Sequence, residues 1–231
     1  MKSIQAWLFR LALYTAGIFI LALGTVLFTC CRLGTSALVS VPFITADITG
    51  LTLGTATTLV FGVMVILQLF LQRKLTLKTL LQLPFSFVFG SIVDFYTLGL
   101  GLAQFQPESL LFRILVLFLA TAATATGAFF MLQGNFIMNA PDGVVALLSL
   151  QTGKTFGQMK LRFDLVMILT ATLLGLLFLG RPEGIGIGTL FAALTVGRGI
   201  RLWETTFFKT APTASGDCSA TIATEEFDPE L

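Results

Sequence analysis

The chain has 231 residues, of which 55% are hydrophobic and only 11% are charged, and its mean hydropathy is +0.92. Soluble domains carry roughly 25% charged residues, so this composition excludes a water-soluble globule and predicts a polytopic membrane protein. The sequence contains no histidine, which disfavours a zinc site and histidine-based acid–base catalysis. We therefore expect no metal, no cofactor and no enzymatic activity.

Six apolar stretches are long enough to cross a bilayer, because about 20 helical residues span its hydrocarbon core. They cover about residues 9–30, 52–72, 80–101, 110–132, 159–180 and 185–205. Two shorter apolar pieces, 34–48 and 142–150, follow the first and the fourth stretch. They are too short to span and are expected to form re-entrant or interfacial helices. The prediction is an all-α membrane protein with six transmembrane helices.

The basic residues separate by membrane side if both termini lie in the cytoplasm. The cytoplasmic segments and adjoining span ends then hold Lys2, Arg10, Arg73, Lys74, Lys78, Lys154, Lys160, Arg162, Arg198, Arg201 and Lys209, and the outer side holds Arg32, Arg113 and Arg181. Because cytoplasmic loops are enriched in Lys and Arg, this distribution predicts N-in and C-in and explains the basic excess without nucleic acid. Residues 210–231 hold five acidic and no basic residues, which is typical of a disordered acidic cytoplasmic tail.

A short motif occurs twice, as TGLTLG at 49–54 and as TGKTFG at 152–157. At the same offset of 103 residues, ALGT at 22–25 aligns with ATGA at 125–128. Each copy of TGxTxG follows a short apolar piece and precedes a long one. By itself the motif is typical of a helix start, and Thr155 with Gln158 predicts a capping box there. Its duplication indicates an internal repeat.

The two halves of the membrane region are residues 1–106 and 107–209. Each half has three predicted crossings, so the second half must enter the membrane from the opposite side. The sequence therefore predicts two inverted-topology three-helix repeats, each with one short helix. Inverted repeats are strongly associated with secondary transporters, whose binding sites lie at the repeat interface beside interrupted helices.

Turn-forming residues open both short helices and are the candidate substrate-binding residues. They are Gly34, Thr35, Ser36, Asn139, Pro141, Asp142 and Gly143. If the N-terminal ends of these short helices lie within the membrane, their free backbone N–H groups could hold an anionic group. Asp142 would compete with an anion or favour a cation, and a purely capping role is an open alternative.

Charged residues within the apolar stretches are further candidates, because a charge in lipid costs roughly 2.5–3.5 kcal/mol on insertion scales. They are Asp94, Arg162, Asp164, Arg198 and Arg201. Asp94 and Arg201 occupy matching positions of the two halves, which favours an ion pair between them. Alternatively, Asp94 or Asp164 carries a coupling proton or cation, and Arg162 serves only as a topology anchor.

Three stretches carry a family resemblance: RLGTSALVSVPFITADITGLTLGT (32–55), APDGVVALLSLQTGKTFGQMKLRFD (140–164) and GIGIGTLFAALTVGRGI (184–200). In these stretches the chain resembles the YczE/YitT-type family of bacterial integral membrane proteins. The resemblance implies a membrane fold in the bacterial inner membrane and no particular substrate.

Two functions are compatible with these features. The first is a secondary transporter or facilitator of a small polar solute, working by alternating access of the repeats. The alternative is a non-transporting membrane partner, such as a substrate-binding subunit of an uptake complex or a regulatory scaffold. The expected partners are the lipid bilayer, a small polar solute and a coupling proton or cation, with homo-oligomerisation left open and nucleic acid not expected.

Overall fold

The computed structural model describes the backbone of residues 2–181 and 184–207 and the side chains of residues 4–181 and 184–199. Within these residues every regular element is helical, as predicted. The elements are α1 (Lys2–Cys30), α2 (Ala37–Thr49), α3 (Leu53–Gln72), α4 (Leu77–Asp94), the π-helix η1 (Phe95–Gly99), the 3₁₀ helix η2 (Leu102–Gln104), α5 (Leu110–Gly134), α6 (Ala140–Thr152), α7 (Phe156–Leu179) and α8 (Ile187–Phe207). The predicted acidic tail, 210–231, lies outside the described residues.

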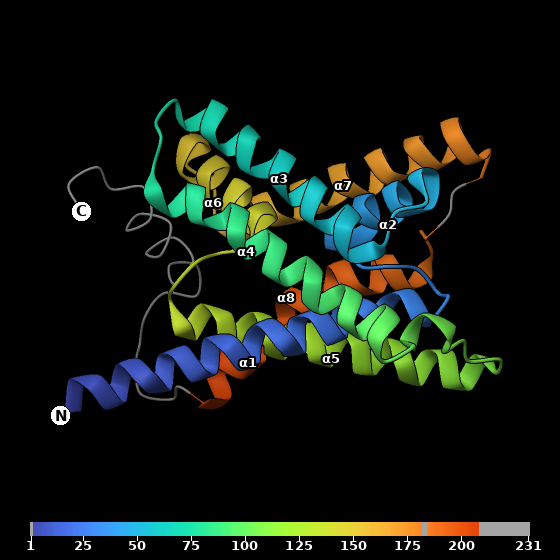
Figure 1. Cartoon of the computed structure of the whole chain (residues 1–231), viewed down its shortest axis with the longest axis horizontal. Helices are drawn as coiled ribbons and strands as arrows, with labels where there is room; N and C mark the ends of the chain where they lie inside the picture. Colours follow the sequence, from blue (N-terminus) through green and yellow to red (C-terminus); the bar gives the residue numbers. More distant parts are fainter. Residues whose placement is uncertain (1, 182–183, 208–231) are drawn as a thin grey trace.

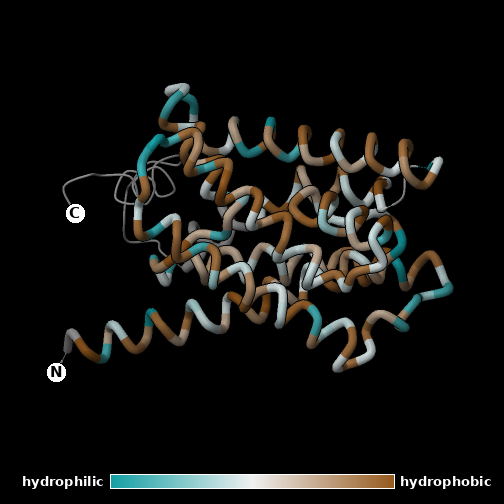
Figure 2. The backbone as a smooth tube through the Cα atoms, turned by 45° about the horizontal axis from the view of Figure 1, so that its top comes forward, coloured by the Kyte–Doolittle hydropathy of each residue, from teal (hydrophilic) through white to brown (hydrophobic). Residues whose placement is uncertain are grey.

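Five of the described helical segments are long and apolar enough to cross a membrane: Ile4–Cys30, Leu53–Gln72, Leu77–Gly99, Leu110–Gly134 and Phe156–Leu179. The sixth predicted span falls on α8, whose apolar described part is the shorter Ile187–Gly199. The third span is not one regular α-helix, because α4 continues directly into the π-helix η1. Figure 2 shows brown, hydrophobic residues along the helices and most of the teal, hydrophilic residues in the connections at their ends.

The TGxTxG motif ends one helix and begins the next in both copies. Gly50 and Gly153 cap α2 and α6 in the left-handed conformation, with φ of 71° and 65°, which glycine adopts without a steric penalty. Thr52 Oγ1 then accepts a hydrogen bond from Thr55 N at 3.1 Å, and Thr155 Oγ1 accepts one from Gln158 N at 3.4 Å. The predicted helix starts are therefore confirmed.

Helices α1 and α5 pack closely along each other through glycines. A Cβ on Gly24 would lie 2.7 Å from Thr124 N, and one on Gly127 would lie 2.8 Å from Leu21 Cα. Neither approach leaves room for a side chain, since both neighbours are backbone atoms. Small residues at such contacts let membrane helices approach closely, where dispersion replaces the hydrophobic effect as the main attraction.

The short helices lie at opposite ends of the molecule (Figure 1). Helix α6 lies toward the end where the N-terminus is found, and α2 lies toward the other end. Each packs against long helices of both halves, α2 on α3 and α7 and α6 on α7 and α3. Most α6 side chains are buried, including those of Val144, Val145 and Ala146, so α6 is enclosed by protein rather than lying on its surface.

Candidate functional site

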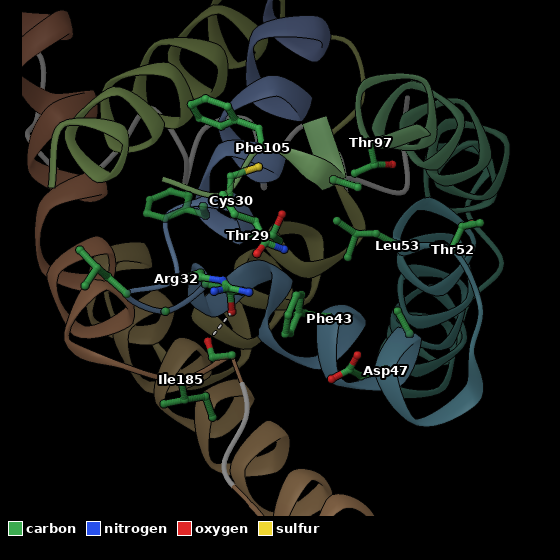
Figure 3. Close-up of a pocket in the computed structure, with 18 of the residues that line it drawn as sticks. Thr29, Cys30, Arg32, Phe43, Asp47, Thr52, Leu53, Thr97, Phe105 and Ile185 are labelled. Carbon is green, nitrogen blue, oxygen red and sulfur yellow. Dashed lines mark hydrogen bonds between the residues drawn. The ribbon is translucent and has the colours of Figure 1, made fainter. Parts of the chain in front are cut away.

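A cavity of about 700 Å³ opens at the α2 end of the molecule. Its walls come from the end of α1 and its connection to α2, the second half of α2 and its connection to α3, the π-helix η1, residues 103–106 and the segment before α8. Figure 3 shows the side chain of Arg32 beside the ring of Phe43, with Asp47 beyond that ring. The volume lies within the roughly 300–1,000 Å³ of small-molecule sites.

The first predicted group of residues, at the start of α2, lies beside this cavity. Gly34 and Thr35 line it, and Ser36 is the buried N-cap of α2 but makes no capping hydrogen bond with its side chain. Both the backbone N and Oγ1 of Thr35 donate to Gly184 O, at 2.7 and 3.0 Å. The capping alternative therefore does not describe this helix start, which is held instead by the segment before α8.

Arg32 brings a positive charge to the cavity. Its side chain is exposed, and its backbone has a φ of 55°, which is uncommon for a residue with a side chain. Within the described part of the chain Arg32 makes no ion pair or hydrogen bond, whereas Asp47, which also lines the cavity, has a partner of its own. Burial raises the pKa of the neighbouring Cys31 thiol, so that thiol adds no negative charge beside the guanidinium.

The second predicted group, at the start of α6, contacts an ionic cluster. Asn139 Oδ1 accepts a hydrogen bond from Asp142 N at 2.9 Å and so caps α6, as the capping alternative predicted. Lys160 Nζ on α7 lies 2.8 Å from Asp142 Oδ1 and 3.1 Å from Asp164 Oδ1. Asp164 is 8% exposed, and Lys160 Nζ is the polar partner that the described residues give its Oδ1. The cluster of Asp142, Lys160 and Asp164 carries two negative charges and one positive charge.

A pair of buried amides borders this ionic cluster. Gln68 on α3 and Gln82 on α4 are both fully buried, and Gln68 Nε2 donates to Gln82 Oε1 at 2.8 Å and to Ala140 O at 2.9 Å. A Cβ on Gly143 would lie 2.7 Å from Gln68 Oε1, so the absence of a side chain lets α6 approach the amides. The start of α6 is thereby tied to α3, α4 and α7.

The other predicted charges lie apart from this cluster. Asp94 accepts hydrogen bonds from Thr52 Oγ1 at 2.6 Å and Gly54 N at 2.7 Å, so it holds the start of α3. Arg162 and Arg198 are exposed. The side chain of Arg201 lies outside the described residues, and with it the predicted ion pair to Asp94.

Several residues of these sites were not predicted from the sequence. Lys160 was assigned only to the cytoplasmic charge pattern, although it lies four residues before Asp164 and so shares its helix face. Gln68 and Gln82 are amides within apolar stretches, and that placement alone could have marked them as polar residues needing a buried partner. Arg32 was counted only as an outer-side charge.

These features define an integral, multi-pass membrane protein: long apolar helices, a cavity at one end and an ionic cluster at the other. The chain belongs to the family of unknown function DUF6198, whose model matches residues 8–205. No curated protein and no solved structure matches the chain. The match shows the family but names neither YczE nor YitT.

Proposed function

We propose that the protein is a secondary transporter or facilitator of a small polar solute, built from two inverted repeats in a bacterial inner membrane, with both termini in the cytoplasm. The two halves have the same order of long and short helices. Helices α2 and α6 begin 103 residues apart, as do α3 and α7. The α1–α5 contacts show the same offset. Gly127 lies 103 residues after Gly24, and Leu21 lies 103 residues before Thr124, so the contact of Gly127 with Leu21 repeats the contact of Gly24 with Thr124.

The observation that carries the proposal is the difference between the two ends. At one end the start of α2 borders an open cavity. At the related end the start of α6 is enclosed by the buried amides and the ionic cluster. Repeats that exchange such conformations would expose a site alternately to the two sides of the membrane.

The ionic cluster is the site for a coupling proton or cation in this mechanism. It has one more acidic than basic group, and the buried Asp164 shares the single ammonium group of Lys160 with Asp142. A proton or cation binding there would remove the repulsion between Asp164 on α7 and Asp142 on α6, while Lys160 would still pair with Asp142. Binding would thus favour closure of the α6 end, and release of the ion would favour its opening.

Flux into proteoliposomes tests this function. We expect purified protein to give saturable uptake of at least one of three radiolabelled solutes, a monocarboxylate, a neutral amino acid or a polyol, with Asp142→Asn/Asp164→Asn reducing it at least tenfold. Lys154→Met, which removes an exposed charge from the loop before α7, is the matched control and should retain uptake.

Two outcomes contradict the proposal. Uptake that persists in the double variant rejects the coupling role of the cluster. Absence of uptake for all three solutes, together with co-purification of a stoichiometric ATPase from native membranes, would favour the non-transporting partner.

A further inference from the structure

We propose that the cavity at the α2 end binds a small monocarboxylate with an apolar body, and that Arg32 holds the carboxylate. The proposal rests on the transport function above and specifies its substrate class. The cavity itself, its charged groups and the nature of its walls support it.

Arg32 is the only basic side chain that lines the cavity in the described part of the chain. The guanidinium has no protein partner there, while Asp47 is already engaged. A guanidinium binds a carboxylate through two parallel hydrogen bonds, and such charge-assisted bonds are about twice as strong as neutral ones. The guanidinium of Arg32 is therefore the charged group left to bind a ligand.

The number of charges favours a monoanion. One arginine offsets one negative charge, and Asp47 on the opposite side of the Phe43 ring (Figure 3) would repel a second. A phosphate dianion or a dicarboxylate would lack a second cation within the cavity. A neutral solute would leave the guanidinium without a counter-ion.

The backbone around Arg32 supports a fixed position for this charge. Gly34 has a φ of 123°, a conformation that side chains rarely allow. The next residue, Thr35, is 2% exposed and hydrogen-bonded to Gly184 O. Leu33 O accepts a hydrogen bond from Gly188 N at 2.8 Å. These contacts hold the three residues that directly follow Arg32 in the connection between α1 and α2.

The walls suit an apolar body. Phe28, Phe43 and Phe105 line the cavity from three different segments, together with Thr29, Thr52 and Thr97. The lining is thus mixed, with aromatic rings for the body of a ligand and polar residues around them. An aromatic or aliphatic carboxylate satisfies both parts of this lining.

Binding by purified protein, measured by titration calorimetry, tests the inference independently of transport. The probes are lactate, benzoate and indole-3-acetate, each beside its neutral amide, and inorganic phosphate. We expect at least one carboxylate to bind saturably and at least tenfold more tightly than its amide. Arg32→Gln should weaken that binding at least tenfold, and Arg32→Lys should weaken it less because the charge remains.

Arg73→Gln is the matched control. Arg73 is also an exposed arginine, with a φ of 53°, but it caps the C-terminal end of α3, away from the cavity. Its substitution should leave carboxylate binding unchanged. A drop in binding in both variants would indicate a general effect of lost charge and would overturn the assignment.

Three other results would overturn it: equal binding of acids and amides, preference for phosphate, or no carboxylate binding in a preparation that transports another solute. The last result would leave the transport proposal standing. Carboxylate binding that depends on Arg32 without any flux would instead support the site and count against transport.

Discussion

Replacing Lys160 with methionine removes the ammonium group that joins Asp142 to Asp164. The Nζ atom lies 2.8 Å from one Oδ1 and 3.1 Å from the other, so the two oxygens are at most about 6 Å apart. Two like charges at about 6 Å repel by about 3 kcal/mol at an effective dielectric constant of about 20. In the wild type the ammonium group offsets this repulsion, and its removal leaves the repulsion uncompensated. The side chains of Lys160 and Asp142 are 27% and 25% exposed, so water reduces this value, and we expect a loss of about 2 kcal/mol.

For a chain of this size a loss of about 2 kcal/mol lowers the midpoint of thermal unfolding by roughly 4–8 °C. The measurement is thermal unfolding of detergent-solubilised protein at neutral pH. The double variant Lys160→Met/Asp142→Asn should recover part of the loss, because a single carboxylate remains. Lys154→Met is the control and should unfold within about 1 °C of the wild type. An unchanged midpoint in Lys160→Met, or a double variant less stable than the single one, would refute the repulsion.

The remaining predictions concern the tertiary contacts. Gln68→Leu should lower the free energy of unfolding by about 1–3 kcal/mol, because Gln82 and a backbone carbonyl lose a buried partner. Thermal unfolding of both single variants and of Gln68→Leu/Gln82→Leu should show that the double variant costs less than the sum of the single ones. Gly127→Ala should destabilise by about 1–3 kcal/mol through overpacking, whereas Gly62→Ala, where a Cβ would meet nothing within 4 Å, should be neutral or stabilising. Asp94→Ala should lower the free energy of unfolding by about 1–2 kcal/mol, because it removes the hydrogen-bond acceptor at the start of α3. If Asp94→Asn instead loses flux while its thermal unfolding is unchanged, the result supports a coupling role for Asp94.

The order and bounds of the helices could be predicted closely from the sequence. The predicted stretch 52–72 corresponds to α3 at Leu53–Gln72, and the predicted short piece 142–150 lies within α6 at Ala140–Thr152. Apolar length and glycine or threonine at helix ends are local signals, so they need no knowledge of packing. The π-helix η1 was missed, because its i→i+5 hydrogen bonds leave no comparable pattern in an apolar sequence.

The candidate sites were predicted only in part, because their partners come from distant segments. Asp142 and Asp164 were identified as charges, but the residue that joins them was not. Thr35 was chosen as a turn residue, yet its partner, Gly184, is 149 residues away. Local sequence marks which backbone positions are unusual, whereas the chemistry of a site depends on which helices meet there.

The two ends of the molecule differ in charge although the halves share an order of helices. The offset of 103 residues sets Asp142, Lys160 and Asp164 of the second half against Val39, Thr57 and Phe61 of the first. These three counterparts are buried and uncharged. The α6 end is therefore held by ions and amides, and the start of α2 by backbone and hydroxyl hydrogen bonds to the segment before α8. If the repeats exchange conformations, the two closed states have different electrostatics, and protons or cations act directly on the α6 end. A coupling ion needs this difference between the two ends, because an ion that stabilised both closed states equally could not shift the equilibrium between them.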